Sequence, residues 1–498
     1  MEITSEQENI RRNKIDKLKD LGIEPYPAII PQENTSAKEI FENYENGRKV
    51  CLSGRLMSFR IMGKAAFAEI KDHSDRVQIY VTRHVISRNI KKNAYNILFK
   101  KLLDIGDIIS IEGFLFKTKV GKITVYVESF YLLSKSLRPL PQVKTDDKGI
   151  VYDAFSSIEQ RYRMRYVDLI VNDHVKDIFV KRSKIIQFIR QYLNQFDYLE
   201  VETPILQPIP GGALARPFIT HHNTLNIPIY LRISNELYLK KLIVGGFKGV
   251  YEFAKDFRNE GIDKTHNPEF TLLELYVAYK DYHWMMNFSE KLIRDLVLAI
   301  NGKETLQFGE KIIEFKVPFT RISIFEAIEK YTGFDISKIN EKDLHKICHK
   351  LGIEIQPGKD SKGRIIDEIF RKRCESYYVK PTFIMDYPEE MSPLTKKHRE
   401  KYGLTERFEI IINGQEIANA YSELNDPIDQ VSRFREQIKL SKRGDDEAML
   451  LDKDFIRALE FGMPPSAGIG IGIDRLVMLL TKQTSIQEVI FFPQMRPK

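Results

Sequence analysis

The sequence predicts an α+β protein in which a small N-terminal β-barrel precedes a larger domain of mixed helices and strands. Short runs of alternating apolar and polar residues fill the region from about residue 48 to residue 134. From about residue 154 helices and strands mix without regular βαβ alternation, which argues against a doubly wound sheet. At 498 residues the chain exceeds the size at which one core keeps growing, so more than one domain is expected.

The composition is that of a globular protein, with 43% hydrophobic and 29% charged residues. The net charge of +8 is compatible with a polyanionic partner but does not identify one. Cys51, Cys348 and Cys374 are too few and too scattered for a disulfide framework, which favours a reducing compartment and hence the cytoplasm. The N-terminus lacks a signal peptide pattern, and no run of about 18 apolar residues predicts a membrane span.

Residues 1–46 are predicted to form a helical extension. Within it, Ile10, Ile15, Leu18 and Leu21 recur at roughly helical spacing before Gly22 ends the pattern. We interpret this segment as an accessory helix.

Residues 47–137 are predicted to form a five-stranded barrel. Five alternating runs carry the pattern: KVCLSGRLMSFR, AAFAEIKD, RVQIYVTR, DIISIEGFLFKT and ITVYVESFYLLSK. Glycines and aspartates separate them, and a helical insert is expected near residues 86–103. Five strands over about 90 residues fit a barrel of the OB type, although another small barrel or a sandwich is also compatible with the pattern.

Residues 138–153, with Pro139, Pro141 and the polar QVKTDDKG, are predicted to be a linker. The larger domain is expected over residues 154–498, with a mainly helical, charged insertion around residues 322–380. Residues 475–481, RLVMLLT, read as an apolar helix.

The densest group of polar side chains lies in VYEFAKDFRNEGIDKTHNPEFTLLELYVAY, where two strand-like runs flank a polar loop. Arg258, Glu260 and His266 come from that loop, and a guanidinium such as Arg258 binds two oxygens of a phosphate or carboxylate at once. On the second run the alternation places Glu274 and Tyr276 on one face and leucines on the other. The alternative is a solvated hairpin with ordinary salt bridges.

A second group contains three acids, Glu409, Glu416 and Glu423, in RFEIIINGQEIANAYSELNDP, each seven residues from the next. On paired strands these acids could converge on one cavity. Carboxylate oxygens suit Mg²⁺, which usually shares its coordination with substrate phosphates, and a remaining acid could accept a ligand ammonium. Spaced glutamates also commonly decorate a surface.

A third group is MPPSAGIGIGIDRLVMLL, in which Gly468, Gly470 and Gly472 alternate along a strand before Arg475 opens a helix. Glycines at every second position leave one strand face bare, so that flat groups can approach closely. The spacing is not that of a dinucleotide-binding fingerprint.

With these three groups in this order, the sequence resembles the class II aminoacyl-tRNA synthetases of the subgroup that serves lysine, asparagine and aspartate. FRNEG with HNPEF is similar to motif 2 of that class, GIGIGIDR to motif 3, and YLEVETPILQPIPGGA to motif 1. The SELND and GGALARPF strings are similar to the lysine members.

The resemblance implies an OB-fold anticodon-binding domain, a catalytic domain with an antiparallel β-sheet flanked by helices, and a homodimer formed through motif 1. It also implies the reaction. ATP and Mg²⁺ would serve to activate L-lysine as lysyl-adenylate with release of pyrophosphate, and lysine would then pass to the 3′-terminal adenosine of tRNA(Lys).

The resemblance further implies site residues, carried over position by position. For ATP these are Arg258, Glu260, His266, Phe270, Glu409 and Arg475, with Arg258 and Arg475 as the catalytic pair. For lysine they are Gly212, Glu236, Arg258, Glu274, Tyr276, Asn419 and Glu423. The metal ligands would be Glu409 and Glu416, and the anticodon-binding residues Arg60, Phe67, Gln78 and Glu128. Without the resemblance, Phe67 would be interpreted as barrel core.

One departure from the family pattern bears on the loop beside Glu236. Ser234 and Asn235 stand where the lysine members usually have Ala-Pro, which removes a rigid residue and leaves the acid in place. Three other functions remain as alternative hypotheses. They are an asparagine or aspartate enzyme of the same subgroup, an inactive RNA-binding or scaffold protein with this fold, and an enzyme that transfers lysine to a protein.

Overall fold

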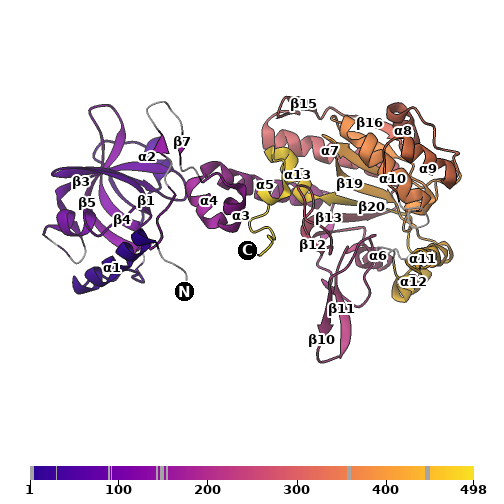
Figure 1. Ribbon diagram of the computed structural model, residues 1–498, viewed down its shortest axis with the longest axis horizontal. Coiled ribbons are helices and arrows are strands. Elements are labelled where there is room, and N and C mark those ends of the chain that lie inside the picture. Colours follow the sequence, from indigo (N-terminus) through magenta and orange to yellow (C-terminus); the bar gives the residue numbers. More distant parts are fainter. Residues whose placement is uncertain are drawn as a thin grey trace. The chain divides into compact units, whose positions relative to one another are not determined.

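The computed structural model describes residues 5–29, 31–87, 90, 92–141, 144–145, 151–152, 155–355, 361–442 and 449–497. The chain forms two compact units, Met1–Ser156 and Ser157–Lys498, which are described separately below (Figure 1). None of the helices in the described residues is long and apolar enough to cross a membrane.

The first unit contains a closed five-stranded barrel with strand order β1-β2-β3-β5-β4. Its strands are β1 (Lys49–Met62), β2 (Ala65–Lys71), β3 (Arg76–Ser87), β4 (Ile108–Lys117) and β5 (Ile123–Ser134). Buried side chains alternate with less buried ones along β2 and β3, as expected when one face of each strand fills a barrel. The predicted barrel is confirmed, and its helical insert is a short π-helical turn, η1 (Tyr95–Phe99).

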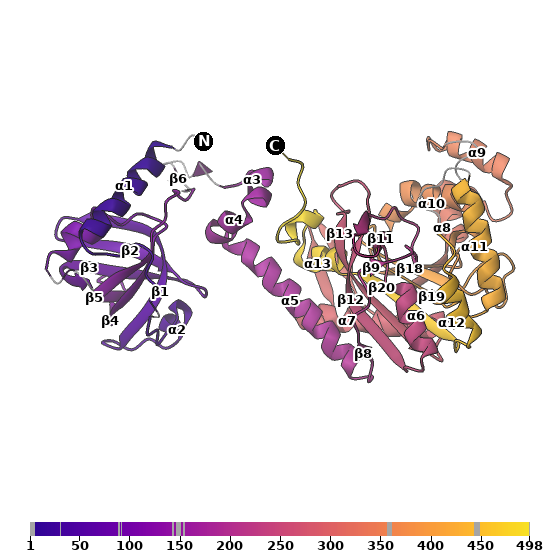
Figure 2. The same cartoon turned by 90° about the horizontal axis from the view of Figure 1, so that it is seen from below.

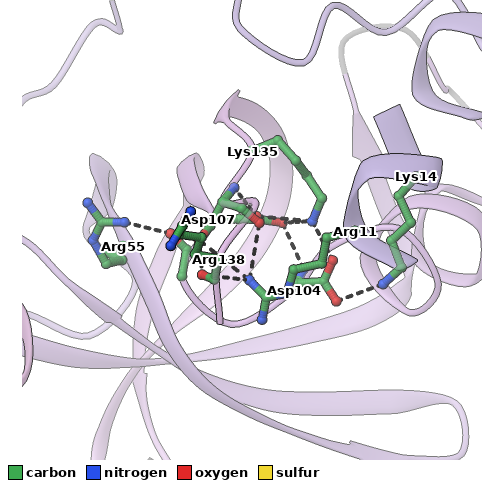
Figure 3. Close-up of polar contacts among 9 residues, drawn as sticks. Arg11, Lys14, Arg55, Asp104, Asp107, Lys135 and Arg138 are labelled. Carbon is green, nitrogen blue, oxygen red and sulfur yellow. Dashed lines mark hydrogen bonds and ion pairs between the residues drawn. The ribbon is translucent and has the colours of Figure 1, made fainter. Parts of the chain in front are cut away.

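Helix α1 (Glu6–Asp20) is held to the barrel by a buried polar cluster, shown in Figure 3. The ammonium of Lys135 is fully buried and pairs with Asp104 at 2.5 Å and Asp107 at 2.7 Å. Lys14 of α1 reaches the same Asp104 at 2.7 Å. Arg11 of α1 donates to the carbonyl oxygen of Ser136 at 3.1 Å. Because two cations of different elements share Asp104, the predicted N-terminal helix is tied to the barrel wall.

The predicted linker, residues 138–153, contains a two-stranded ribbon of β6 (Lys144–Thr145) and β7 (Val151–Tyr152). Residues 142–143, 146–150 and 153 lie outside the described residues. A short helix of the first unit, α2 (Ala37–Glu42), precedes the barrel.

The second unit is built on an eight-stranded sheet with strand order β16-β17-β18-β19-β20-β13-β12-β8. The bounds are β8 (Leu199–Glu200), β12 (Gly249–Phe257), β13 (Glu269–Ala278), β16 (Thr320–Ser323), β17 (Thr382–Met385), β18 (Arg407–Ile412), β19 (Gln415–Ser422) and β20 (Ser466–Gly472). All neighbours are antiparallel except the two outermost pairs, β16 with β17 and β12 with β8. The predicted α+β class is confirmed.

Three helices cover the apolar face of this sheet: α5 (Asp173–Asn194), α7 (Tyr282–Asn301) and α13 (Ile473–Thr481). On the opposite side in Figure 1 lie α6 (Glu236–Val244), α11 (Pro427–Lys442) and α12 (Lys453–Glu460). Leu273, Leu275 and Val277 of β13 join the core under the first group, whereas Tyr276 packs with the second group. The two faces of β13 therefore differ as the alternation predicts.

The remaining elements of the second unit lie outside this sheet (Figure 2). Helices α8 (Ile324–Thr332), α9 (Glu341–Lys350) and α10 (Lys362–Arg373) lie between β16 and β17 in sequence and share a core of their own. The others are α3 (Ile158–Arg163), α4 (Arg165–Val171), β9 (Leu206–Gln207), β10 (Ile219–His222), β11 (Ile227–Leu231), β14 (Thr305–Phe308), β15 (Lys311–Glu314), η2 (Glu375–Tyr377), η3 (Glu389–Met391) and η4 (Ile486–Glu488).

The buried cluster under α1 generates a first prediction. Lys135→Met leaves Asp104 and Asp107 without their buried cation, and this type of change costs about 3–5 kcal/mol of stability. Lys14→Met removes a partly exposed pair, so its cost is about 1 kcal/mol or less. Native-state hydrogen exchange on barrel peptides is the measurement, because the single tryptophan, Trp284, lies in the other unit. Equal losses for the two variants would contradict the assignment of Lys135 as the central cation.

Candidate active site

The main cavity of the second unit lies on the polar face of the sheet and has a volume of about 320 Å³. Its floor is β20, where Gly468, Gly470 and Gly472 lack side chains. A Cβ atom added to Gly468 would overlap Glu423 Oε1 and the ring of Tyr276. A Cβ atom at Gly470 would lie 3.2 Å from Glu274 Oε1. The glycines therefore make room for side chains that lean over β20 from both neighbouring strands.

Strand register explains which side chains meet over these glycines. Gly470 pairs with Glu274 of β13 on one side and with Asn419 of β19 on the other. Gly468 pairs in the same way with Tyr276 and Tyr421. Directly paired residues share a face of a sheet, so this row of acids, phenols and an amide opens into one cavity.

The structure brings most of the predicted site residues together around this cavity. Those that line it are Gly212, Glu236, Arg258, Glu260, His266, Phe270, Glu274, Tyr276, Glu416, Asn419 and Arg475. Glu409 and Glu423 stand behind the lining, each buried against a cation of the protein. To contact a ligand in the cavity as proposed, Glu409 and Glu423 must therefore extend beyond the residues that line it.

One end of the cavity is cationic. Arg258 follows the last residue of β12 and its guanidinium lies 5.0 Å from the ring centroid of Phe270. Arg258 Nε is buried and, among the described residues, has no hydrogen-bond partner. Arg475 donates to Glu416 Oε2 at 3.2 Å and lies 3.1 Å from His266 Nε2. Two guanidinium groups with free hydrogen-bonding capacity suit a polyphosphate.

Two of the three spaced glutamates converge beside this end, because the hairpin of β18 and β19 contains a bulge between Ile410 and Ile411. Burial and then the neighbouring Glu416 raise the pKa of Glu409 to about 8. Burial would also raise the pKa of Glu416, but Arg475 and Arg407 hold it below its usual value. Arg407 donates to Glu409 Oε1 at 2.7 Å. A buried acid whose proton affinity is raised by a second carboxylate marks a place where a cation is favoured.

The residues present fit magnesium that is shared with a substrate. Among the described residues, no group of three or more His, Cys, Asp or Glu side chains is arranged to hold an ion alone. A pair of carboxylates beside a phosphate-sized, cationic cavity matches Mg²⁺, which takes one or two carboxylates and completes its shell with phosphates and water.

The other end of the cavity is anionic. Glu236, at the first turn of α6, accepts from the phenol of Tyr421 at 2.6 Å. Glu274 accepts from the phenol of Tyr276 at 2.8 Å. Burial, then Glu236 and Asp256, raise the pKa of Glu274 to about 8. Burial also raises the pKa of Glu423 well above its usual value. Acids gathered in this way favour a cationic ligand.

The loop before Glu236 is fixed by hydrogen bonds in place of the proline that the resembled enzymes usually carry. The side chain of Asn235 is buried and its amide donates to Glu252 Oε2 at 2.8 Å. Ser234 Oγ accepts from the backbone amide of Glu236 at 3.1 Å. Arg232 donates to Glu252 Oε1 at 2.8 Å, which closes the network. The backbone that carries Glu236 is therefore held without proline.

In the first unit, the predicted anticodon residues lie on the barrel strands. Arg60 pairs with Phe67, and Phe67 pairs with Tyr80 in the strand register. Phe67 is half-buried on the outer face, whereas its neighbours Ala66 and Ala68 fill the core. The interpretation of Phe67 as barrel core is therefore wrong. Gln78 lies on β3 two residues from Tyr80, and Glu128 is exposed on β5.

Sequence reasoning missed several residues that the structure adds to these sites. Tyr80, Tyr126 and Phe114 extend the row begun by Phe67, with centroid distances of 4.9 Å, 5.8 Å and 4.8 Å between successive rings. The alternation of these residues along β3, β4 and β5 is visible in the sequence. Which rings lie next to one another depends on the register between the strands, which the sequence does not show. Lys240 was also missed, although it stands four residues after Glu236 on a helix.

The chain matches two protein families. Residues 157–496 match the family described as tRNA synthetases class II (D, K and N), and residues 50–133 match the OB-fold nucleic acid binding domain. The predicted OB type of the barrel is thus confirmed.

Three curated relatives, each named lysine–tRNA ligase, are similar over nearly the whole chain. The protein of Porphyromonas gingivalis is 58% identical over 499 residues, which cover 99% of this chain and 86% of the relative. That of Christiangramia forsetii is 58% identical over 499 residues, covering 100% and 87%. That of Azobacteroides pseudotrichonymphae is 58% identical over 497 residues, covering 99% of both.

The raised pKa of Glu274 predicts how stability depends on pH. The carboxyl ionises near its ordinary value of 4.5 when unfolded and near 8 when folded. Stability is therefore greatest below about pH 4.5 for this group and falls as pH rises through the folded value, by on the order of 5 kcal/mol. Glu274→Gln should remove this loss, so that ligand-free Glu274→Gln protein gains thermal stability over the wild type at pH 8.5 but not at pH 5. A pH-independent difference in melting temperature would show that Glu274 is not the group concerned.

Proposed function

We propose that this chain, which belongs to the class II tRNA synthetases of the D, K and N group, is a lysine–tRNA ligase. The observation that carries the proposal is the cavity itself, where buried acids at one end face two guanidinium groups at the other. A cationic amino acid fits the first end and a nucleoside triphosphate fits the second.

The first step is the formation of an adenylate. The lysine carboxylate oxygen attacks the α-phosphorus of ATP, a new C–O–P linkage forms, and the bond to pyrophosphate breaks. Because the carboxylate is already ionised near neutral pH, this step needs no general base. Arg258 and Arg475 align the reactants and neutralise charge that develops on the phosphate oxygens, which is where catalysis of phosphoryl chemistry chiefly arises.

The second step transfers lysine to RNA. A ribose hydroxyl of the 3′-terminal adenosine of tRNA(Lys) attacks the lysyl carbonyl carbon, and AMP leaves with the bonding electrons. The remaining nucleotide contacts are assigned from the family resemblance: Phe270 would stack on the adenine, Glu260 would meet its amino group, and His266 would contact the outer phosphates. All three residues line the cavity, which supports this assignment.

Magnesium would be held by Glu409 and Glu416, and it would add positive charge beside the phosphates. The hydrogen bond from Arg475 to Glu416 places the proposed metal ligand and the phosphate-binding cation side by side. Glu409 reaches this position only if it exchanges part of its contact with Arg407.

Selection of lysine is assigned to the anionic end. We place the α-ammonium against Glu236 near Gly212, and the side-chain ammonium against Glu423 and Tyr276, with Glu274 and Asn419 nearby. Glu423 Oε1 supports this placement, because it is buried and makes no hydrogen bond among the described residues. Asparagine brings no second cation and aspartate adds a negative charge, so both leave buried carboxylates unpaired, a cost on the order of 10⁴ in specificity.

The barrel is proposed to bind the anticodon of tRNA(Lys). A row of partly exposed aromatic rings with a flanking guanidinium suits unstacked bases of a single strand, which here would be a uridine-rich anticodon. Arg60, Gln78 and Glu128 offer hydrogen bonds to base edges.

We further propose a homodimer formed through the motif 1 region. Ile205 and Leu206 of this region are 44% and 48% exposed, and Ile219 and Ile227 of the adjacent β10–β11 hairpin are 68% and 39% exposed. Large apolar side chains that are left exposed in one region of the chain are available for contact with a second subunit. We place the enzyme in the cytoplasm, in keeping with three buried cysteines that are all free.

Three other functions are separable from this one. An asparagine or aspartate enzyme would exchange pyrophosphate with those amino acids instead of lysine. A scaffold protein would form no adenylate at all. An enzyme that lysylates a protein would not depend on the anticodon.

Glu423→Gln is predicted to weaken lysine activation severely. The amide keeps the shape of the side chain but removes the charge that the ammonium requires, so the KM for lysine should rise by roughly 100-fold or more. Amino-acid-dependent pyrophosphate exchange measures this, and the KM for ATP should stay within about a factor of two because Glu423 lies at the far end from the guanidinium groups. Unchanged lysine-dependent rates would exclude the assigned role.

Phe67→Ala is predicted to weaken tRNA charging but not lysine activation. Stacking on an aromatic ring contributes about 1–3 kcal/mol per base, so the KM for tRNA should rise by roughly 5-fold to 150-fold. Pyrophosphate exchange, which takes place in the other unit, should be unaffected. The matched control is Phe41→Ala on α2, where the ring is 40% exposed but lies outside the barrel strands. If both variants charge tRNA equally well, the barrel face does not bind the anticodon as proposed.

A further inference from the structure

Lys240 is a cation of the protein itself, buried at the anionic end of the cavity. Its side chain is fully buried and its ammonium lies 2.5 Å from Glu236 Oε1. The same ammonium pairs with Glu423 Oε2, so that one nitrogen joins the two acids from different elements. Helical spacing accounts for the pair with Glu236, because residues four apart share a helix face. Nothing in that spacing accounts for Glu423, which follows β19.

Aromatic rings enclose the ammonium on its remaining sides. The ring centroids of Tyr276, Tyr421 and Phe455 lie 6.0 Å, 5.5 Å and 5.9 Å from Lys240 Nζ. Ring faces at this distance attract a cation that is removed from water. Burial disfavours the charge of Lys240, but Glu236 and Glu423 outweigh it and raise the pKa of the ammonium above its usual value. Lys240 is therefore charged, and it cannot leave without exposing two buried carboxylates to each other.

The three acids that the assignment places near the ligand match an amino acid with two ammonium groups only when Lys240 is counted with them. Glu236, Glu274 and Glu423 carry three negative charges when ionised, and Lys240 removes one of them. Two negative charges then remain for a ligand to neutralise. An amino acid with two ammonium groups supplies two positive charges, while its carboxylate faces the guanidinium groups.

We propose that Lys240 is a positioning residue of the amino-acid pocket, which holds Glu236 and Glu423 at a fixed separation and sets the pocket charge for a ligand with two ammonium groups. This inference rests on the proposed function, since it presumes lysine as the ligand. It adds a specificity-determining residue that touches no substrate atom in the assignment above.

The position of the two carboxylates follows from the shared ammonium. Each has one oxygen on Lys240 Nζ, while the second oxygen of Glu423 stays unpaired beside Gly468. With Lys240 in place, the free oxygen of Glu423 lies against Gly468, which belongs to the cavity floor. Without it, two buried carboxylates repel each other or share a proton, and the ammonium of the ligand would be drawn between them.

Three variants test the proposal by lysine-dependent pyrophosphate exchange. Lys240→Met keeps nearly the volume of lysine and removes the charge, whereas Lys240→Arg keeps the charge and adds volume. We expect the KM for lysine to rise by roughly tenfold or more in Lys240→Met and by less in Lys240→Arg. The KM for ATP should stay within about a factor of two in both. A purely structural role predicts the opposite order, because methionine packs better than arginine in a lysine-sized space.

The matched control is Lys241→Met, the same substitution one position along the helix. Lys241 points to another partner, Asp454, at 2.8 Å, and its side chain is 20% exposed. The KM of the Lys241→Met enzyme for lysine should equal that of the wild type. The proposal is overturned if Lys240→Met also keeps the wild-type KM for lysine, or if Lys240→Arg is the weaker enzyme of the two.

Folding failure of Lys240→Met would also be informative. In that case the double variant Lys240→Met/Glu423→Gln, which removes one charge of each sign, should recover soluble protein with a cooperative unfolding transition. Failure of the double variant to improve on the single one would overturn the charge-balancing role. The wild type separates this inference from the proposed function: a wild-type enzyme without lysine-dependent exchange would contradict the function itself, whatever the Lys240 variants do.

Discussion

The bare face of β20 is the constraint on which the rest of the second unit depends. Gly468 and Gly470 sit between strands whose paired residues are large and polar. A single Cβ atom at Gly468 would collide with the paired Tyr276 and with Glu423, which follows β19. Because Gly468, Gly470 and Gly472 leave this face of the strand bare, Glu274 and Tyr276 can extend across it toward β19. The cavity is thus a consequence of glycine spacing at the centre of the sheet, and its lining is decided by register with β13 and β19.

The buried charges of the cavity are a second constraint on the second unit, after the glycine spacing of β20. The polar face of the sheet holds several buried carboxylates, among them Glu236, Glu274, Glu409 and Glu423. Buried acids require partners. At the cationic end of the cavity Arg407 pairs with Glu409, and at the anionic end Lys240 pairs with Glu236 and Glu423. In both places a cation of the protein holds an acid near the cavity. Within the part of the chain that the structure describes, Arg258 at the cationic end still has an unpaired nitrogen for a ligand, and Glu423 at the anionic end still has an unpaired oxygen. These internal counterions neutralise some of the buried acids, so the site can fold. Among the described residues the other acids still lack a cation, and a ligand can supply it.

Patterns confined to one segment were predictable from the sequence, whereas pairings between segments were not. The alternation in β1 to β5 predicted the barrel, and the glycines of β20 predicted an open strand face. Lys240 has the spacing of an ordinary salt bridge on a helix, and its second partner appears only when β19 is folded against α6. The convergence of Glu409 and Glu416 depends on a bulge that seven-residue spacing does not reveal. Phe67 was similarly ambiguous, because alternation does not tell which face of a barrel strand is the inner one.

In the proposed assignment, the number of charges is what would distinguish lysine from asparagine and aspartate at this sheet face. In the free pocket, burial keeps protons on acids such as Glu274, whose pKa is raised to about 8. A ligand with two ammonium groups replaces those protons with permanent charges, and the gain is large because the site excludes water. A ligand with one ammonium group leaves one acid protonated and gains correspondingly less. On the proposed charge count, a pocket without its own ammonium would leave lysine one positive charge short, just as asparagine is one short in the pocket with Lys240. The proposed internal cation would then set the number of charges that the ligand must bring, and the acids around it would decide where those charges lie.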